Sequence, residues 1–197
     1  MQRLNSVSPD TAEGKAKTLL DGVQAKLGIT PNIMKTMANS PAVLDAYLKF
    51  SGSLGSGVLT AQNREQIALN VGEFNQCGYC LAAHSTIGKS LGLTEEEIQS
   101  NRSGTGSDEK TNALMNFSRK IVEKRGFVSD QDIQEFRDAG YGDAEITEVV
   151  ANVALNIFTN YFNHLAQTEV DFPEVKPLAD QPATACATEG EGAACCH

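Results

Sequence analysis

Two cysteines and a histidine stand close together in the stretch NQCGYCLAAHS, which covers residues 75–85. Cys77 and Cys80 have the C-x-x-C spacing, and His84 follows the second cysteine by four residues. On a helix, residues three or four apart lie on the same face, so both thiols and the imidazole can meet. Three interpretations compete for this trio: thiol redox chemistry, a metal site, or small cysteines that fill a core.

Helical periodicity extends this face along the chain. At about 100° per residue, Cys77, Cys80 and His84 point the same way as Ile87 and Leu91. The stripe is apolar apart from the reactive groups, so we expect the thiols and the imidazole to face inward. Cysteines with this spacing near a helix start can also close a disulfide with little backbone movement, as thioredoxin-type motifs do.

A carboxylate falls inside the apolar arc of the preceding predicted helix, which covers residues 60–75. This residue is Glu65, and a buried carboxylate needs a partner or a raised pKa. The two predicted helices are joined at residues 76–78, so we expect a hairpin that brings Glu65 toward His84 and Cys80. An inert core has no use for such a carboxylate, so the redox interpretation is favoured.

The residue types also suggest a division of roles. The helix start favours Cys77 as the attacking thiolate, whereas contact with His84 favours Cys80. We predict attack by Cys80, because a proton acceptor one turn away both activates the sulfur and carries the proton onward. Cys77 then resolves the sulfenic acid, and Glu65 orients His84 or acts as a general base, directly or through a water. The alternative is zinc bound by all four side chains.

Composition limits the classes of function. The chain has 197 residues and a formal net charge of −9, and its Lys and Arg residues form no cluster, so nucleic acid is not expected as a partner. No stretch approaches the roughly 20 apolar residues that span a bilayer, and the first residues lack the apolar run of a signal peptide. We therefore expect a cytoplasmic protein without a membrane partner, where a C-x-x-C pair is catalytic or metal-binding more often than structural.

Start and stop signals predict helix after helix. They predict an all-α fold, a compact multi-helix bundle with the C-x-x-C motif at the start of a core helix. We expect a single helical domain over residues 1–173 and an extended or mobile tail over residues 174–197, with a linker at residues 101–109. The predicted helices cover residues 8–28, a short segment from 31, 40–54, 60–75, a segment from 94, 107–126, 129–140 and 143–167.

The segment EQIALNVGEFNQCGYCLAAH resembles the signature of the alkylhydroperoxidase D (AhpD) family, within the carboxymuconolactone decarboxylase-like superfamily. Glu65, Cys77, Cys80 and His84 match that signature position by position. LGITPNIMKTMANSPAVLDAYLKF and NVALNIFTNYFNHLAQTEVDFP resemble the upstream helices and the last helix of its peroxidase-related branch. The resemblance therefore covers most of residues 20–173.

This resemblance implies an all-helical homo-oligomer, a trimer or hexamer, that reduces hydroperoxides with a dithiol. It also implies Cys80 as the peroxidatic cysteine, Cys77 as the resolving cysteine, and a Glu65–His84 proton relay. We expect an antioxidant activity on hydrogen peroxide or organic hydroperoxides with no haem, flavin or metal cofactor. An external dithiol, lipoyl-bearing or thioredoxin-like, would reduce the disulfide. The alternatives are a thiol–disulfide oxidoreductase or redox sensor with little peroxidase turnover, and a zinc-binding structural protein.

One position departs from the family pattern. The best-studied branch carries a histidine just before the second cysteine, where this chain has Tyr79. Part of the relay is therefore missing or replaced. Tyr79 either packs in the core or donates a hydrogen bond to the peroxide or its product.

Two further groups of residues are candidates for a role. The last predicted helix is apolar nearly all round, which suggests a subunit interface. Its asparagine stripe suggests a hydrogen-bonded seam at that contact, or a lining of the redox pocket by Asn160 or His164. We interpret the tail cysteines as part of a mobile segment. The alternatives are that they bind a soft metal or exchange disulfides with the C-x-x-C pair. The stripe comprises Asn152, Asn156, Asn160 and Asn163, and the tail holds Cys186, Cys195, Cys196 and His197.

Overall fold

The structure is a computed structural model of the chain and describes residues 1–180. The predictions made for the tail cysteines and His197 lie outside the described residues. Every regular element of residues 1–180 is a helix, so the predicted all-α fold is confirmed. The α-helices are α1 (Gly14–Leu27), α2 (Asn32–Met37), α3 (Pro41–Leu54), α4 (Ala61–Phe74), α5 (Gly78–Ser90), α6 (Glu95–Arg102), α7 (Glu109–Glu123), α8 (Asp130–Asp138) and α9 (Asp143–Ala166), followed by a short 3₁₀ turn, η1 (Leu178–Asp180).

The helix starts follow the local capping signals. The Thr60 side chain accepts a hydrogen bond from the backbone of Asn63, and Thr94 and Ser129 form capping boxes with residues three positions later. Because such caps satisfy backbone N–H groups that the helix itself leaves unpaired, they fix where each helix begins. Helices α1, α2 and α3 have no side-chain cap, and α1 departs from its predicted start. Residues 8–12 form a turn on Ser8, and Gly14 has φ of 56°, so α1 begins six residues later than predicted.

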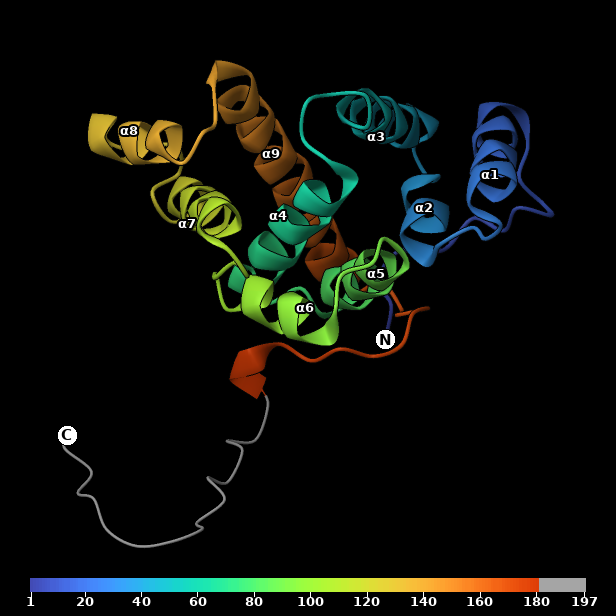
Figure 1. Cartoon of the computed structure of the whole chain (residues 1–197). Coiled ribbons are helices and arrows are strands. Elements are labelled where there is room, and N and C mark those ends of the chain that lie inside the picture. The colour runs from blue at the N-terminus through green and yellow to red at the C-terminus, as the bar shows by residue number, and fades with distance from the viewer. Residues whose placement is uncertain (181–197) are drawn as a thin grey trace, which may run out of the picture.

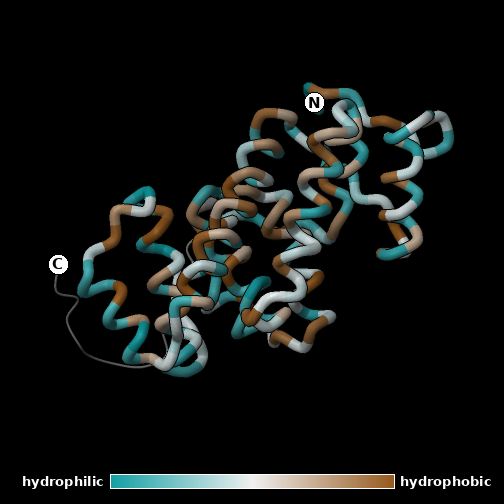
Figure 2. Tube along the Cα trace, turned by 90° about the horizontal axis from the view of Figure 1, so that it is seen from above, coloured by the Kyte–Doolittle hydropathy of each residue, from teal (hydrophilic) through white to brown (hydrophobic). Residues whose placement is uncertain are grey.

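Helix α4 lies at the centre of the molecule (Figure 1). It packs against α5, α6, α7 and α9, while α1, α2 and α3 form one flank and α7 and α8 the other. Apolar and polar residues alternate along the helices in Figure 2, as amphipathic helices require. The interior contains one apolar cluster around α1–α3 and the start of α5, a second between α4, α7, α8 and α9, and a small third one between α4 and α6.

The second cluster contains a stack of aromatic rings. Phe136 lies between Phe117 and Tyr141, with ring centroids 4.3 and 4.2 Å away. Large buried rings contribute strongly to a small core, and this stack joins α7 to α8. The flank that it stabilises lies away from the C-x-x-C motif, so the motif depends on the first cluster.

Helix α9 is only partly covered within one chain. Its outer face carries exposed apolar residues, namely Val150, Phe158, Tyr161 and Leu165. The predicted homo-oligomer would cover such a face, and it stays a prediction. The asparagine stripe is different, because all four of its side chains are buried inside the single chain. The interpretation of this stripe as a seam between subunits is therefore wrong.

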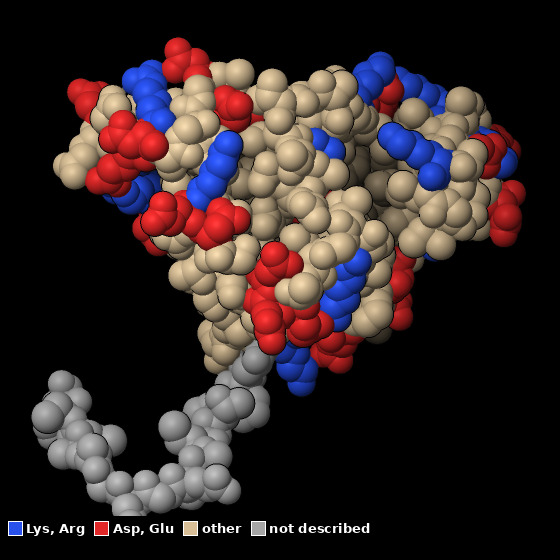
Figure 3. Space-filling model, in the orientation of Figure 1, with Lys and Arg blue, Asp and Glu red and all other residues tan. Residues whose placement is uncertain are grey.

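Acidic and basic side chains are interspersed over the face drawn in Figure 3. No helix among residues 1–180 combines the length and the apolar character needed to cross a membrane.

A buried arginine holds the start of the predicted tail against the bundle. Arg102 lies in the last turn of α6, not in a linker, and its side chain is 1% exposed. Its Nε donates to Glu73 Oε2 at 2.8 Å, and its Nη2 donates to the carbonyl of Lys176 at 2.6 Å. Glu73 Oε1 also accepts from the backbone N–H of Leu178 at 2.6 Å. One ion pair therefore joins α4, α6 and residues 176–178.

We expect Arg102→Ala to lower the free energy of unfolding by about 3–5 kcal/mol, because it leaves the Glu73 carboxylate buried without its cation. The measurement is chemical denaturation followed by circular dichroism. The double variant Arg102→Met with Glu73→Met removes both charges and should lose less than the single variant. A loss below about 1 kcal/mol in Arg102→Ala would contradict the assigned role of this pair.

Candidate active site

A tight turn between α4 and α5 positions the cysteine pair. Gln76 has φ of 54°, a left-handed conformation that a non-glycine residue adopts only under constraint. The backbone N–H of Cys77 then donates to the carbonyl of Gly72 at 2.9 Å. This geometry makes Cys77 the N-cap residue of α5, and the predicted hairpin of the two helices is confirmed.

Both cysteines are reduced and buried. The exposed fractions of Cys77 and Cys80 are 1% and 3%. The backbone N–H of Cys80 points at Cys77 Sγ, with N and Sγ 3.4 Å apart. Burial alone would raise the pKa of the Cys80 thiol. The Cys77 thiol, the charge of His84 and the amide of Asn163 outweigh it and lower the pKa of Cys80 to about 7. Near neutral pH, a large share of Cys80 is therefore thiolate.

Cys77 has the opposite character. Its hydrogen bond to Cys80, burial and the negative charge of Cys80 all raise the pKa of the Cys77 thiol above its usual value. Cys77 thus keeps its proton and donates it toward the neighbouring sulfur. The two thiols of the motif are chemically different. The sequence allowed either cysteine to attack, and this difference in pKa favours Cys80 as the nucleophile.

Glu65 and His84 form the expected pair across α4 and α5. Glu65 Oε2 lies 2.7 Å from His84 Nδ1, and their side chains are 16% and 23% exposed. Burial would lower the pKa of the imidazole, but the charge of Glu65, the hydrogen bond to it and the Cys80 thiolate raise that pKa. Because Nδ1 is bonded to Glu65, Nε2 is the nitrogen left to exchange protons in the site.

Asn163 on α9 contacts the reactive sulfur directly. Its Nδ2 donates to Cys80 Sγ at 3.3 Å, and the neighbouring Asn160 amide also lowers the pKa of Cys80. Asn160 Oδ1 accepts from Asn75 Nδ2 at 2.9 Å. The asparagine stripe thus faces the cysteines, and Asn152, Asn156 and Asn163 line the cavity beside Cys80. Neither Asn160 nor the exposed His164 belongs to that lining, so the expected lining by one of these two residues is wrong. Sequence reasoning missed the contact of Asn163, although its position in the stripe was visible.

Tyr79 lies in the wall of the cavity beside Cys80, with its hydroxyl already bonded. Its hydroxyl donates to Asp171 Oδ1 at 2.8 Å and accepts from the backbone N–H of Ile33 at 3.2 Å. Phe172 meets its ring edge-on, with centroids 5.8 Å apart. Because the hydroxyl already has two partners, the interpretation that Tyr79 packs in the core is favoured over hydrogen bonding to a peroxide.

A cavity of about 480 Å³ opens beside Cys80, a volume in the range of small-molecule sites. Figure 3 shows this face hollowed between α4 and the α2–α3 part of the chain. Glu65, His84 and Cys80 line the cavity, but Cys77 does not, so the resolving sulfur lies behind the attacking one. Most other lining residues are apolar and include Leu27, Ile29, Ile33, Met34, Leu54, Ile87, Leu155 and Phe172.

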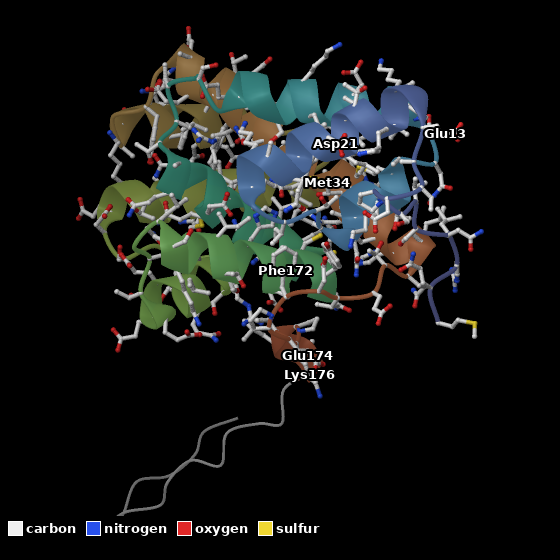
Figure 4. All side chains as sticks on the ribbon, turned by 90° about the vertical axis from the view of Figure 1, so that its right-hand side faces the viewer. Glu13, Asp21, Met34, Phe172, Glu174 and Lys176 are labelled. Atoms are coloured by element: carbon white, nitrogen blue, oxygen red, sulfur yellow. The ribbon has the colours of Figure 1, made fainter. Side chains whose placement is uncertain are left out.

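The apolar walls come from segments far apart in the sequence. Figure 4 labels Met34 on α2 and Phe172 on the segment after α9, and both contribute to the cavity. Glu174 and Lys176 lie further along that segment. The cavity therefore needs the flank of α1–α3 and the C-terminal segment as well as the hairpin that carries the cysteines.

The zinc interpretation receives no support from this arrangement. Within residues 1–180, no group of three or more His, Cys, Asp and Glu side chains is disposed to hold a metal ion. Glu65 directs an oxygen at His84, whereas zinc ligands converge on one central point. The four side chains are therefore arranged as a chain of interacting groups.

Comparison with known proteins agrees with the fold and the motif. Residues 41–124 match the carboxymuconolactone decarboxylase family model, and this segment includes Glu65, both cysteines and His84. Together with the structural relatives below, this match confirms the predicted resemblance to AhpD-like proteins of the carboxymuconolactone decarboxylase-like superfamily. No curated protein sequence matches the chain.

Three solved structures share the fold. A peroxidase-related protein with an AhpD core from Ralstonia eutropha JMP134 is 21% identical, with a TM-score of 0.79 over 86% of this chain and 92% of its own. A peroxidase-related protein from Silicibacter sp. TM1040 is 21% identical, with a TM-score of 0.74 over 86% and 94%. The debrominase Bmp8, in a variant bound to 2,3,4-tribromopyrrole, is 16% identical, with a TM-score of 0.72 over 87% and 93%.

We expect Asn163→Leu to raise the pKa of the Cys80 thiol above about 7, by roughly one unit, because a hydrogen bond to a charged group contributes about 1.5–3 kcal/mol. Thiolate absorbance at 240 nm across a pH titration measures this pKa. Asn152→Leu is the matched control. Asn152 lies on the same helix and lines the same cavity, but its amide donates to the carbonyl of Glu148. Equal pKa values in the two variants would contradict the contact.

Proposed function

We propose that this chain reduces organic hydroperoxides and hydrogen peroxide with the thiols of Cys80 and Cys77, as an antioxidant enzyme. The observation that carries the proposal is the asymmetry of the pair. Cys80, with a pKa of about 7, lines the cavity, while Cys77 keeps its proton behind it. A low-pKa sulfur open to small molecules, with a protonated thiol beside it, suits a dithiol peroxidase.

In the first step, the Cys80 thiolate attacks the terminal oxygen of the hydroperoxide. An S–O bond forms, the O–O bond breaks, and the electron pair passes to the leaving alkoxide. The imidazolium of His84, held through Nδ1 by Glu65, supplies the proton that converts the alkoxide to an alcohol. Cys80 is left as a sulfenic acid, in equilibrium with its sulfenate.

In the second step, the Cys77 sulfur attacks the sulfenic sulfur of Cys80. The S–O bond breaks, and His84, deprotonated in the first step, passes the proton of the Cys77 thiol to the departing hydroxide, which leaves as water. A thiol and a sulfenic acid become one disulfide, and the imidazole stays neutral. An external dithiol then reduces the disulfide to the Cys80 thiolate and the Cys77 thiol and is itself oxidised, and the second proton of that dithiol restores the imidazolium of His84. We propose a small or flexible dithiol, because both sulfurs are buried.

The same burial bears on the alternative of general thiol–disulfide exchange. A disulfide on the surface of a folded protein cannot approach sulfurs that are 1% and 3% exposed unless the chain opens. Small oxidants can enter through the cavity. Peroxide reduction therefore fits the geometry better than exchange with large proteins.

A second candidate is reductive debromination of an aromatic ring. It is favoured by the likeness to the debrominase bound to 2,3,4-tribromopyrrole and by the apolar walls of the cavity beside Cys80. Two thiols would supply two electrons, a C–H bond would replace the C–Br bond, and bromide, a proton and a disulfide would form. Bromide release distinguishes this reaction from peroxide reduction.

We expect cumene hydroperoxide to consume two thiols per chain in stopped-flow experiments. The full-length protein is used with Cys186, Cys195 and Cys196 changed to serine, so that only the C-x-x-C pair is counted. In this background, Cys77→Ser should stop at a sulfenic acid that dimedone traps, and Cys80→Ser should not react. Thiol loss with small disulfides or tribromopyrrole but not with peroxide would overturn the proposal.

Glu65→Gln should slow peroxide reduction at pH 7 by about 10²-fold. Loss of the carboxylate removes the group that raises the pKa of His84, so the imidazole becomes neutral and no longer lowers the pKa of Cys80. The thiolate then forms at higher pH, and the midpoint of the pH–rate profile, about 7 in the native chain, moves upward. Glu96→Gln, at an exposed position on α6, is the charge-matched control. An unmoved midpoint would contradict the relay.

A further inference from the structure

Tyr47 lines the same cavity as the reactive groups. It lies in α3, and its side chain packs against the apolar cluster that contains both cysteines. It also lines the cavity together with Cys80, Glu65 and His84. Nothing in the sequence pattern of the motif points to this residue, because it precedes Glu65 by eighteen positions and lies on another helix.

The hydroxyl of Tyr47 stands out among the tyrosines. Tyr79 bonds to Asp171 and Ile33, Tyr141 donates to the carbonyl of Lys110, and Tyr161 is 60% exposed. Within residues 1–180, the Tyr47 hydroxyl forms no hydrogen bond, and its side chain is partly buried. Because Tyr47 borders the cavity, its free O–H can donate to a ligand that enters this space.

The electrostatics of the cavity keep this hydroxyl protonated. Burial and the negative charges of Cys80 and Glu65 raise the pKa of Tyr47 to about 12. The two anions act on the hydroxyl because all three groups border the same space. At neutral pH, Tyr47 is therefore a hydrogen-bond donor in the lining of a cavity that also contains Glu65, Cys80, the imidazole of His84 and the guanidinium of Arg64.

We infer that Tyr47 is a substrate-contacting residue whose O–H donates a hydrogen bond to the oxygen of an apolar organic ligand seated beside Cys80. This inference rests on the proposed function, in which that oxygen is the alkoxy oxygen of an organic hydroperoxide. While Cys80 attacks the terminal oxygen, the bond from Tyr47 stabilises the negative charge that develops on the alkoxy oxygen. His84 supplies the proton that is transferred, and Tyr47 retains its own.

The lining and the volume of the cavity indicate the class of substrate. Leu27, Ile29 and Leu54 belong to the apolar lining, and a cavity of about 480 Å³ leaves room for a ring or a branched chain. Hydrogen peroxide is polar on both sides and fills little of this space. The geometry therefore favours a hydroperoxide with a bulky apolar body, oriented by a single oxygen contact.

A binding cycle tests this contact without any reaction. The ligands are 2-phenyl-2-propanol, the alcohol formed from cumene hydroperoxide, and tert-butylbenzene, in which a methyl group replaces the hydroxyl. Titration calorimetry or ligand-observed NMR gives the affinity of each for the reduced full-length chain. Tyr47→Phe should weaken binding of the alcohol about five- to tenfold and leave binding of the hydrocarbon unchanged within about twofold. Tyr161→Phe, at an exposed site, should change neither.

Equal effects of Tyr47→Phe on both ligands, or no effect on either, would overturn the inference. Failure of the proposed function would give another result. The thiols of the native chain would then not react with peroxide, while the binding cycle would still show the oxygen contact. Kinetics add a second readout. Tyr47→Phe should slow thiol oxidation by cumene hydroperoxide about tenfold, yet leave alkylation of Cys80 by iodoacetamide and its pH midpoint unchanged. A shifted midpoint would indicate a general disturbance of the site and count against a contact with the substrate.

Discussion

The candidate site depends on one hydrogen bond between two helices, from His84 Nδ1 on α5 to Glu65 on α4. This bond places a carboxylate and an imidazole in a largely apolar surrounding, where each charge would be costly alone. Together they form a pair whose positive member lowers the pKa of Cys80. The tight turn at Gln76 keeps the helices adjacent. The reactivity of the sulfur therefore depends on the geometry of the hairpin.

The remaining elements complete what the hairpin cannot supply. Helix α9 contributes buried amides, and Asn163 gives the Cys80 thiolate a second donor besides the Cys77 thiol. Helices α1 to α3 and the segment after α9 contribute apolar walls, which keep water away and strengthen every charge interaction inside. Arg102 and Glu73 hold the end of that segment against the bundle. A small helical protein thereby combines a polar interior site with a continuous core.

The parts that could be predicted from the sequence are those that depend on local spacing. Helix starts at Thr60, Thr94 and Ser129 follow from capping chemistry, and the Glu65–His84 contact follows from two amphipathic helices joined by a short turn. The other parts depend on tertiary packing. Periodicity revealed the asparagine stripe of α9 but not which helix it faces, and a polar segment containing Arg102 resembled a linker, although tertiary contacts bury it. The distant Tyr47 carries no local signal at all.

The position of Cys80 in the lining of this cavity has a kinetic consequence for the proposed cycle. Peroxide and reductant would both act on this sulfur, each after the other has left, and both would pass through the same entrance. Such a scheme has the ping-pong form. Each substrate can then also occupy the site in the form of the enzyme that reacts only with the other substrate. A high concentration of reductant would then slow turnover, and the width of one passage would set the size limit for oxidant and reductant alike.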